Sequence, residues 1–317
     1  MTSKRIPMGV SGCLIGEQVR YDMSHKKNRF VVDVLGDYAE WFSVCPEVEA
    51  GLGLPRETMR IVNNDDGTRM VGNRSSDDYT IQVRAASAGL ARYVKRYRLR
   101  GFVLKSGSPT CGMDRVRTYD GNGVPNRNGV GLFAQKLMRD HPSLPIEEED
   151  RLNDPRIREN FITRVFAYDR WLRLRGDRPK FSDVVAFHED HRMLLLAHSP
   201  QTATELGSLV AKAGSLELHY LLETYEAGFM MGLKTIASPG RHANVLKHLA
   251  GFLKNDLGKD DKAELNRIID DYRGGRVPLV VPLVLLTHHI QHLRDDWLHA
   301  QRYLSPYPAE LALRSAV

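Results

Sequence analysis

Three short apolar segments in the first half of the chain each lead into a turn that carries a cysteine. These segments cover residues 6–12, 38–44 and 102–104. Cys13, Cys45 and Cys111 follow them, each beside a Gly or a Pro, which is the pattern of buried strands that end at tight turns. Because ligands bind beyond the carboxyl ends of strands in open α/β sheets, we expect the three thiols to meet at one rim of a parallel sheet.

The segments between the strands predict the remainder of an α/β domain. Helical spacing of apolar residues indicates crossover helices over residues 26–35 and 78–100, and another helix over 128–139. The buried stripe expected for the 78–100 helix consists of Ile81, Ala85, Ala88, Leu90, Ala91 and Val94. Residues 60–77 are typical of a hairpin or a mobile loop, and residues 116–123 of a turn.

From about residue 155 the pattern is almost wholly helical. The predicted helices cover residues 161–174, 182–197, 202–213, 216–233, 238–254, 259–274, 278–289 and 295–303. The acidic stretch 145–150 before them is typical of a strand and linker that end the first domain. We therefore predict an α/β N-terminal domain with a small, mainly parallel sheet over residues 1–153, and an all-α C-terminal domain over residues 154–317.

Composition narrows the class of protein. The chain has 317 residues, of which 42% are hydrophobic and 26% are charged, and no segment reaches the roughly 18 consecutive apolar residues of a membrane span. The N-terminus lacks the apolar core of a secretory signal, so we expect a cytoplasmic protein without membrane partners. A net charge of +6 favours an anionic partner, which could be lipid headgroups, metabolite phosphates or nucleic acid. No obligate protein partner is evident.

The three cysteines allow several interpretations. An odd number in a reducing compartment argues against a disulfide framework, and free cysteines are often buried as small hydrophobic residues. Zinc would require a fourth ligand and usually a paired C-x-x-C, which is absent, and a nucleophilic cysteine would require a histidine, of which the first half has only His25 and His141. Three separated thiolates also suit an iron–sulfur cluster in which one iron has no protein ligand.

Three long motifs carry a resemblance to a known family. Residues 10–22, 45–56 and 105–112, taken in this order, resemble the motifs of the thiouracil desulfidase family, and the similarity extends over roughly residues 5–150. The helical remainder, especially residues 238–251 and 276–283, resembles the YbgA-type domain. The combination resembles the two-domain tRNA 4-thiouridine desulfidases.

The resemblance implies a [4Fe-4S] cluster held by Cys13, Cys45 and Cys111, with the fourth iron open to the sulfur of the substrate. It also implies that Glu47 and Ser108 are the catalytic pair. Without the family, Glu47 could be a surface carboxylate or a helix-start charge, and Ser108 could only stabilise the turn before Pro109. Gly107 and Thr110 depart from the family pattern, because Arg and Ser are expected at these positions in many relatives.

From these roles we formulate a mechanism and a function. Glu47 would move protons as the acid/base, and Ser108 would orient water or the pyrimidine, with Ser106 a weaker candidate for the same role. The predicted reaction is a non-redox hydrolysis that converts 4-thiouridine in tRNA to uridine and releases sulfide. The alternatives are a desulfidase of free thiouracil or other small thionucleobases, and a non-enzymatic iron–sulfur or RNA-binding protein.

Basic residues in both halves suggest contacts to RNA. The candidates are Arg92, Lys95, Arg96, Arg241, His242, Lys247 and Lys254. The alternative for the segment 92–100 is a solvated helix face. His188, His191 and His198 superficially suggest a metal site, but their spacing is not that of His-Glu-x-x-His, and packing or phosphate contact is favoured.

Overall fold

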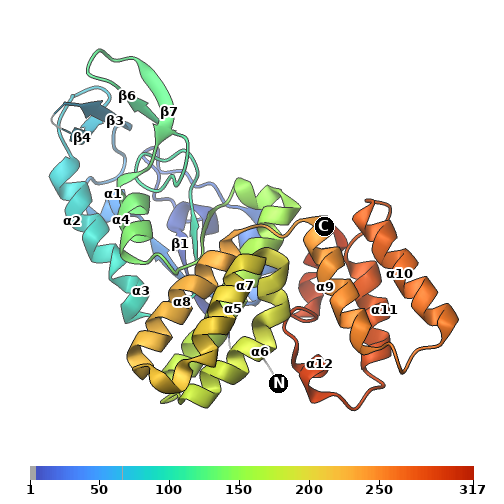
Figure 1. Ribbon diagram of the computed structural model, residues 1–317. Helices are drawn as coiled ribbons and strands as arrows, with labels where there is room; N and C mark the ends of the chain where they lie inside the picture. Colours follow the sequence, from blue (N-terminus) through green and yellow to red (C-terminus); the bar gives the residue numbers. More distant parts are fainter. Residues whose placement is uncertain (1–4, 66) are drawn as a thin grey trace. The chain divides into compact units, whose positions relative to one another are not determined.

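A four-stranded parallel sheet forms the centre of the first of the two compact units into which the chain divides after Asn153. The computed structural model describes residues 5–65 and 67–317 (Figure 1). The strands lie in the order β2 (Ala39–Val44), β1 (Ile6–Ser11), β5 (Phe102–Leu104) and β8 (Ile146–Glu148). Every pairing in this sheet is parallel, which confirms the predicted sheet, and its fourth strand comes from the acidic stretch.

A second four-stranded sheet extends this unit. Its order is β4 (Gly67–Gly72), β3 (Met59–Asn64), β6 (Val116–Tyr119) and β7 (Pro125–Gly129). The antiparallel pair of β3 and β4 confirms the hairpin. The turn predicted over residues 116–123 is instead strand β6 followed by the tip of a second hairpin. The sequence conceals β7 because its residues are polar and mostly exposed, without the apolar alternation that reveals a half-buried strand.

The helices of the first unit are shorter than predicted. They are α1 (Pro46–Glu49), α2 (Thr80–Ala91), α3 (Tyr93–Arg96) and α4 (Leu132–Asp140). Residues 30–37 form only a π-helical turn, Phe30–Val34, and a 3-10 turn, Leu35–Asp37.

The predicted buried stripe of α2 was partly wrong. Ile81 is 82% exposed and Ala85 is exposed, whereas Val83 is buried and packs with Ile61 and Met70 of the second sheet. The second sheet, of which the sequence predicted only one hairpin, thus decides which face of α2 is buried.

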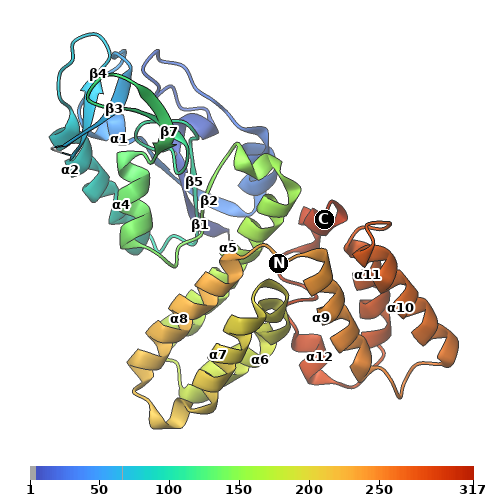
Figure 2. The same cartoon turned by 45° about the horizontal axis from the view of Figure 1, so that its top comes forward.

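The second unit is built from helices alone. They are α5 (Pro155–Gly176), α6 (Phe181–His198), α7 (Pro200–Ala211), α8 (Leu218–Lys234), α9 (Pro239–Phe252), α10 (Lys259–Arg273), α11 (Val280–Ile290) and α12 (Asp296–Ala300). The predicted all-α region is confirmed, and Asp154, Ser199 and Ser238 cap α5, α7 and α9 through their side chains. Figure 2 shows α9, α10 and α11 packed together.

Aromatic packing holds the longer helices of this unit together. Trp171 of α5 stacks on Tyr225 of α8 with 5.0 Å between ring centroids, and Phe187 of α6 contacts both rings at their edges. Such pairs contribute roughly 0.5–1.5 kcal/mol beyond burial. Among the described helices, none is both long enough and apolar enough to cross a membrane.

The loop between β5 and β6 is fixed by the start of α4. The amides of Leu132 and Phe133, which have no partner inside the helix, donate to the carbonyl oxygens of Pro109 (3.2 Å) and Thr110 (2.9 Å). Gly131 allows this approach, because a Cβ at this position would lie only 2.4 Å from the Thr110 carbonyl oxygen. The backbone of residues 109–112 is therefore positioned by a helix whose first turn is buried.

We predict that Gly131→Ala destabilises the first unit by about 1–3 kcal/mol, because the new methyl group must push backbone atoms apart. Urea denaturation measures this change. Gly121→Ala is the matched control, because a Cβ at Gly121 meets no atom within 4 Å. Equal stabilities for the two variants would contradict the packing described for the loop.

Candidate active site

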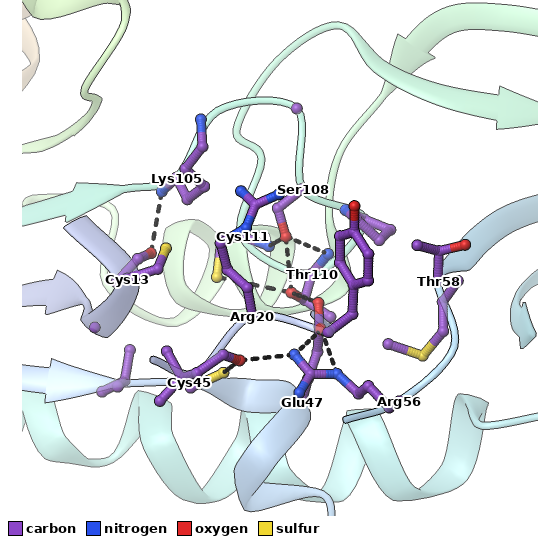
Figure 3. Close-up of a pocket in the computed structure, with 18 of the residues that line it drawn as sticks. Cys13, Arg20, Cys45, Glu47, Arg56, Thr58, Lys105, Ser108, Thr110 and Cys111 are labelled. Carbon is purple, nitrogen blue, oxygen red and sulfur yellow. Dashed lines mark hydrogen bonds and ion pairs between the residues drawn. The ribbon is translucent and has the colours of Figure 1, made fainter. Parts of the chain in front are cut away.

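Cys13, Cys45 and Cys111 line one cavity of about 220 Å³ (Figure 3). Cys13 lies in the 3-10 turn Gly12–Ile15 that follows β1, and Cys45 is the residue between β2 and α1. Cys111 lies in the loop that follows β5. Cys13 and Cys111 are buried and Cys45 is half-buried. The three thiols meet beyond the carboxyl ends of three adjacent parallel strands, as the strand pattern predicts.

Burial disfavours the charged form of all three thiols. It raises the pKa of Cys13 to about 11, to which the nearby Cys45 also contributes, while Lys105 and Arg20 lower it. Burial likewise raises the pKa of Cys45 and of Cys111. With no cation bound, the three groups are therefore protonated at neutral pH, and a bound metal would displace their protons.

The arrangement of the thiols limits what the cavity can hold. In the described part of the chain, no three His, Cys, Asp or Glu side chains form a group that could hold a metal ion. The thiols instead stand around a cavity, so a group that accepts all three must extend over more space than one ion. Sulfur donors favour soft metals and iron–sulfur groups, and the carboxylate nearest to them, that of Glu47, is already bonded to Arg56 and Thr110.

The carboxylate of Glu47, on α1, is held from two sides. Arg56 donates to Oε2 through Nε at 2.9 Å and also through Nη2, and Thr110 Oγ1 donates to Oε1 at 2.9 Å. Arg56 donates further to the carbonyl oxygens of Val19 (2.9 Å) and Gly53 (3.2 Å). Because the Arg56 and Glu47 side chains are only 6% and 14% exposed, this ion pair is largely withdrawn from solvent. The carboxylate therefore has a fixed position at the edge of the cavity.

Thr110 connects Glu47 to Ser108. Ser108 Oγ accepts the backbone amides of Thr110 (3.2 Å) and Cys111 (3.1 Å), and it lies 2.9 Å from Thr110 Oγ1. The Thr110 hydroxyl proton is directed at Glu47, so Ser108 is the donor between the two hydroxyls. The side chains form a directed chain of hydrogen bonds from Ser108 through Thr110 to Glu47 (Figure 3).

Two buried carboxylates at the end of β8, those of Glu148 and Glu149, support the same loop. Lys105 forms an ion pair with Glu149, whose Oε2 also accepts the backbone amide of Ser106 at 2.7 Å. Glu148 accepts the backbone amide of Met113 at 2.7 Å. Ser106 Oγ is engaged with Glu149 and Asp150, which makes Ser106 an anchor of the loop as well as a residue of the cavity lining.

The predicted RNA contacts of the first unit lie on one short segment. Arg92, Lys95 and Arg96 are exposed around α3. Tyr97 stacks on Phe42 with 4.6 Å between centroids, so one face of its ring is covered, and Tyr93 makes an edge contact with Tyr97.

The predicted RNA contacts of the second unit are not all available. Lys254 is exposed, whereas Lys247 forms an ion pair with Asp270 and Arg241 donates to the His198 carbonyl oxygen at 2.9 Å. His242 was wrong as a phosphate contact. It is 6% exposed and its Nδ1 lies 3.0 Å from the hydroxyl of the buried Tyr303, because the chain that follows α12 covers this face of α9.

The other histidines of this unit belong to the core. His188 lies 3.2 Å from the Tyr225 hydroxyl, His191 accepts from Arg170 Nε at 2.9 Å, and His198 bonds the Thr235 carbonyl oxygen at 2.7 Å. All three are buried. Their burial and these contacts agree with the packing role that the sequence favours.

Comparisons with known proteins match the two parts of the chain to two different families. A family model described as 2-thiouracil desulfurase matches residues 8–149. Residues 8–149 therefore belong to the 2-thiouracil desulfurase family. A second model, described as a protein of unknown function, DUF1722, matches residues 192–308.

Individual relatives match one part of the chain each. The uncharacterized protein YbgA of Escherichia coli (strain K12) is 29% identical over 164 residues, which cover 51% of this chain and 97% of YbgA. The uncharacterized protein YbbK of Bacillus subtilis (strain 168) is 28% identical over 152 residues, which cover 46% of this chain and 97% of YbbK. A solved structure, the [4Fe-4S]-dependent thiouracil desulfidase TudS, is 30% identical, with 48% of this chain and 95% of that chain covered and a TM-score of 0.39.

Two residues of the desulfurase-family site carried no predicted role. Arg56 ends the second motif, and Thr110 stood out only as a departure from the expected Ser. A carboxylate that is withdrawn from solvent requires a cation, so Arg56, in the same motif, could have been proposed as the partner of Glu47. The link through Thr110 joins residues 63 positions apart in the sequence, and no local pattern reveals it.

Four buried neutral histidines predict acid sensitivity of the helical unit. Burial lowers the pKa of His188, His191, His198 and His242, so the unfolded chain binds more protons below its ordinary histidine pKa of about 6.5. Stability is therefore fully present above pH 6.5 and falls as the pH decreases. His242→Gln should reduce this slope by about 1.4 kcal/mol per pH unit, measured by chemical denaturation at several pH values. An unchanged slope would contradict the burial of His242.

Proposed function

We propose that this chain is a [4Fe-4S]-dependent desulfidase that converts 4-thiouridine in tRNA to uridine by hydrolysis. The observation that carries the proposal is the convergence of three thiols, the Glu47 carboxylate and the Ser108 hydroxyl on one cavity. Membership of residues 8–149 in the 2-thiouracil desulfurase family supports removal of sulfur from a thiopyrimidine as the reaction class.

The cavity is suited to a cubane cluster. Cys13, Cys45 and Cys111 are the only cysteines in the sequence, so a four-iron cluster held by them retains one iron without a cysteine ligand. When bound, such a cluster supplies a Lewis acid that binds the soft thiocarbonyl sulfur and polarises its bond to the ring carbon.

Glu47 is proposed to act as the acid/base. Water attacks ring carbon C4, the C–S bond breaks, and sulfur leaves as sulfide, so the reaction needs no electron donor or acceptor. A proton must leave the attacking water, and a fixed carboxylate at the edge of the cavity is suited to accept it. Arg56 keeps that carboxylate in place while Oε1 faces Thr110.

The directed chain from Ser108 to Glu47 provides a route for this proton. The backbone amides of Thr110 and Cys111 occupy both lone pairs of Ser108 Oγ, so one of these bonds must open before Oγ can accept a proton from water. Transfer of the Ser108 hydroxyl proton to Thr110, and of the Thr110 proton to Glu47 Oε1, then matches the proton that Oγ has accepted. Ser108 thus orients water, and Glu47 stores the proton until it protonates the departing sulfur.

The second unit supports tRNA as the substrate. Removal of sulfur from a free base would need no helical domain of the length of residues 154–317, whereas a base within RNA requires a positioned backbone. Exposed basic residues are present in both units, namely Arg92, Lys95 and Arg96 in the first and Lys254 in the second. A free thiouracil is the second candidate substrate, and the description of the matching family model as 2-thiouracil desulfurase favours it.

The substrate test compares three probes. We expect the anaerobically reconstituted protein to desulfurise tRNA that carries 4-thiouridine, with loss of the thio-base absorbance and release of sulfide, and to act poorly on free 4-thiouracil and 2-thiouracil. Cys111→Ser, which removes one proposed cluster ligand, should lose both the cluster absorbance and the activity. Rapid turnover of a free base without turnover of tRNA would favour the second candidate, and no turnover of any probe would reject an enzymatic role.

The hydrogen-bond chain predicts different effects for two substitutions of Thr110. Thr110→Val removes the hydroxyl that links Ser108 to Glu47, so we expect kcat to fall by about 10²-fold. Thr110→Ser keeps the hydroxyl and should retain activity within about threefold. Both variants should keep the cluster absorbance, which separates proton transfer from assembly. Equal activity of the Val and Ser variants would contradict the relay.

A further inference from the structure

A second and larger cavity, of about 620 Å³, adjoins the reaction cavity beside the β3–β4 hairpin. Both cavities are lined by Arg56, Glu57 and Met59. The second is also lined by Leu52, Pro55, Arg74, Tyr79 and Gln82. Its volume lies in the range of pockets that bind small organic ligands, so it can take a group larger than a pyrimidine base.

Arg56 lines both cavities, and its guanidinium is not free to bind a ligand. It donates to Glu47, to the Val19 carbonyl oxygen and to the Gly53 carbonyl oxygen. The acid/base group of the proposed reaction is thus bonded directly to a residue that the two cavities share.

Glu57 shapes the second cavity without leaving its charge unpaired. Its carboxylate accepts the backbone amides of Arg74 (2.7 Å) and Ser75 (3.1 Å), the Ser75 hydroxyl, and the Tyr79 hydroxyl at 3.2 Å. These bonds lower the pKa of Glu57 to about 2. The carboxylate thus fixes the turn that carries Arg74 and holds the ring of Tyr79 at the cavity wall.

Two hydrogen-bonding side chains of the lining remain available. Among the described residues, neither the Arg74 guanidinium nor the Gln82 amide has a hydrogen-bond or ion-pair partner. Tyr79, Leu52 and Met59 supply aromatic and apolar surface next to them, and all three pack against the buried cluster around Ile61 and Met70. Besides the paired Arg56 and Glu57, the lining thus combines the available cation of Arg74, the amide of Gln82 and an aromatic and apolar wall.

We infer that the second cavity binds the nucleotide next to the reacting one in an RNA strand. A guanidinium suits a phosphodiester, an amide suits a ribose hydroxyl or a base edge, and an aromatic wall suits a base face. The inference rests on the proposed RNA substrate, and it assigns recognition of the strand to the desulfurase-family unit itself. It also explains why a cavity larger than the reaction cavity adjoins it directly.

The kinetic test uses substrates of increasing length with the reconstituted full chain. Arg74→Ala should raise KM for 4-thiouridine tRNA and for a thiolated trinucleotide about tenfold, and leave kcat/KM for 4-thiouridine nucleoside and its monophosphate unchanged. Gln82→Ala should act in the same direction with a smaller effect. Arg127→Ala is the matched control, because Arg127 is an exposed arginine on β7 that lines neither cavity.

A binding measurement separates this inference from the proposed reaction. Fluorescence anisotropy with a short unthiolated RNA should show about tenfold weaker binding to Arg74→Ala than to the unsubstituted protein or to Arg127→Ala. The plot of log affinity against log salt should also become shallower by about 0.7, the loss of one phosphate contact on a single strand.

The outcomes distinguish the two proposals. If Arg74→Ala weakens RNA binding in this way but the unsubstituted protein does not desulfurise tRNA, the second cavity retains its assignment and the proposed function fails. If tRNA is desulfurised and Arg74→Ala changes neither KM nor RNA binding, the assignment of the cavity is wrong. An equal effect of Arg74→Ala on the monophosphate would also overturn it, because Arg74 would then contact the phosphate of the reacting nucleotide.

Discussion

The hydrogen bond from Thr110 to Glu47 is the contact on which the geometry of the cavity depends. It joins the loop after β5 to the helix after β2, and each of these segments carries one of the three cysteines. Arg56 donates to the other oxygen of the same carboxylate. The loop is therefore bonded to a carboxylate whose own position is fixed. Polar groups next to the thiols, rather than the thiols themselves, therefore keep Cys45 and Cys111 facing one space before any cofactor is bound.

The edge strand β8 provides the second support of the loop. Burying carboxylates is costly unless they are paired or hydrogen-bonded, and the carboxylates of Glu148 and Glu149 satisfy this condition through the loop itself. Burial raises the pKa of Glu148, while the amides of Met113 and Asp114 lower it. The acidic end of the first unit is thus part of the site. A linker interpretation of residues 145–150 accounts for the position of the stretch but not for its buried charges.

The sequence was informative where the signal is local. Apolar runs that stop at Gly or Pro locate β1, β2 and β5, and helical periodicity with Ser, Asp and Pro at the helix starts locates the eight helices of the second unit. The failures concern contacts between distant segments. The burial of His242 depends on Tyr303, which is 61 positions away. Ile81 is exposed because α2 packs its other face on the second sheet, and the polar strand β7 of that sheet could not be recognised from the sequence. The roles of Glu47 and Ser108 came from the family resemblance, because neither residue type is distinctive alone.

The two departures from the family pattern, Thr110 and Gly107, change the site to different extents. Thr110 keeps the hydroxyl of Ser, and that hydroxyl makes the bond to Glu47, so the departure adds a methyl group and leaves the link intact. Gly107 has a φ of +64°, a left-handed conformation that suits glycine, and it removes the cation expected at the loop tip. Lys105 is paired with Glu149, yet it still lowers the pKa of Cys13. Arg20 lines the cavity, also lowers the pKa of Cys13 and has a buried Nε without a hydrogen-bond partner. The positive potential on the Cys13 side therefore comes from the start of the loop after β5, through Lys105, and from the segment after β1, through Arg20.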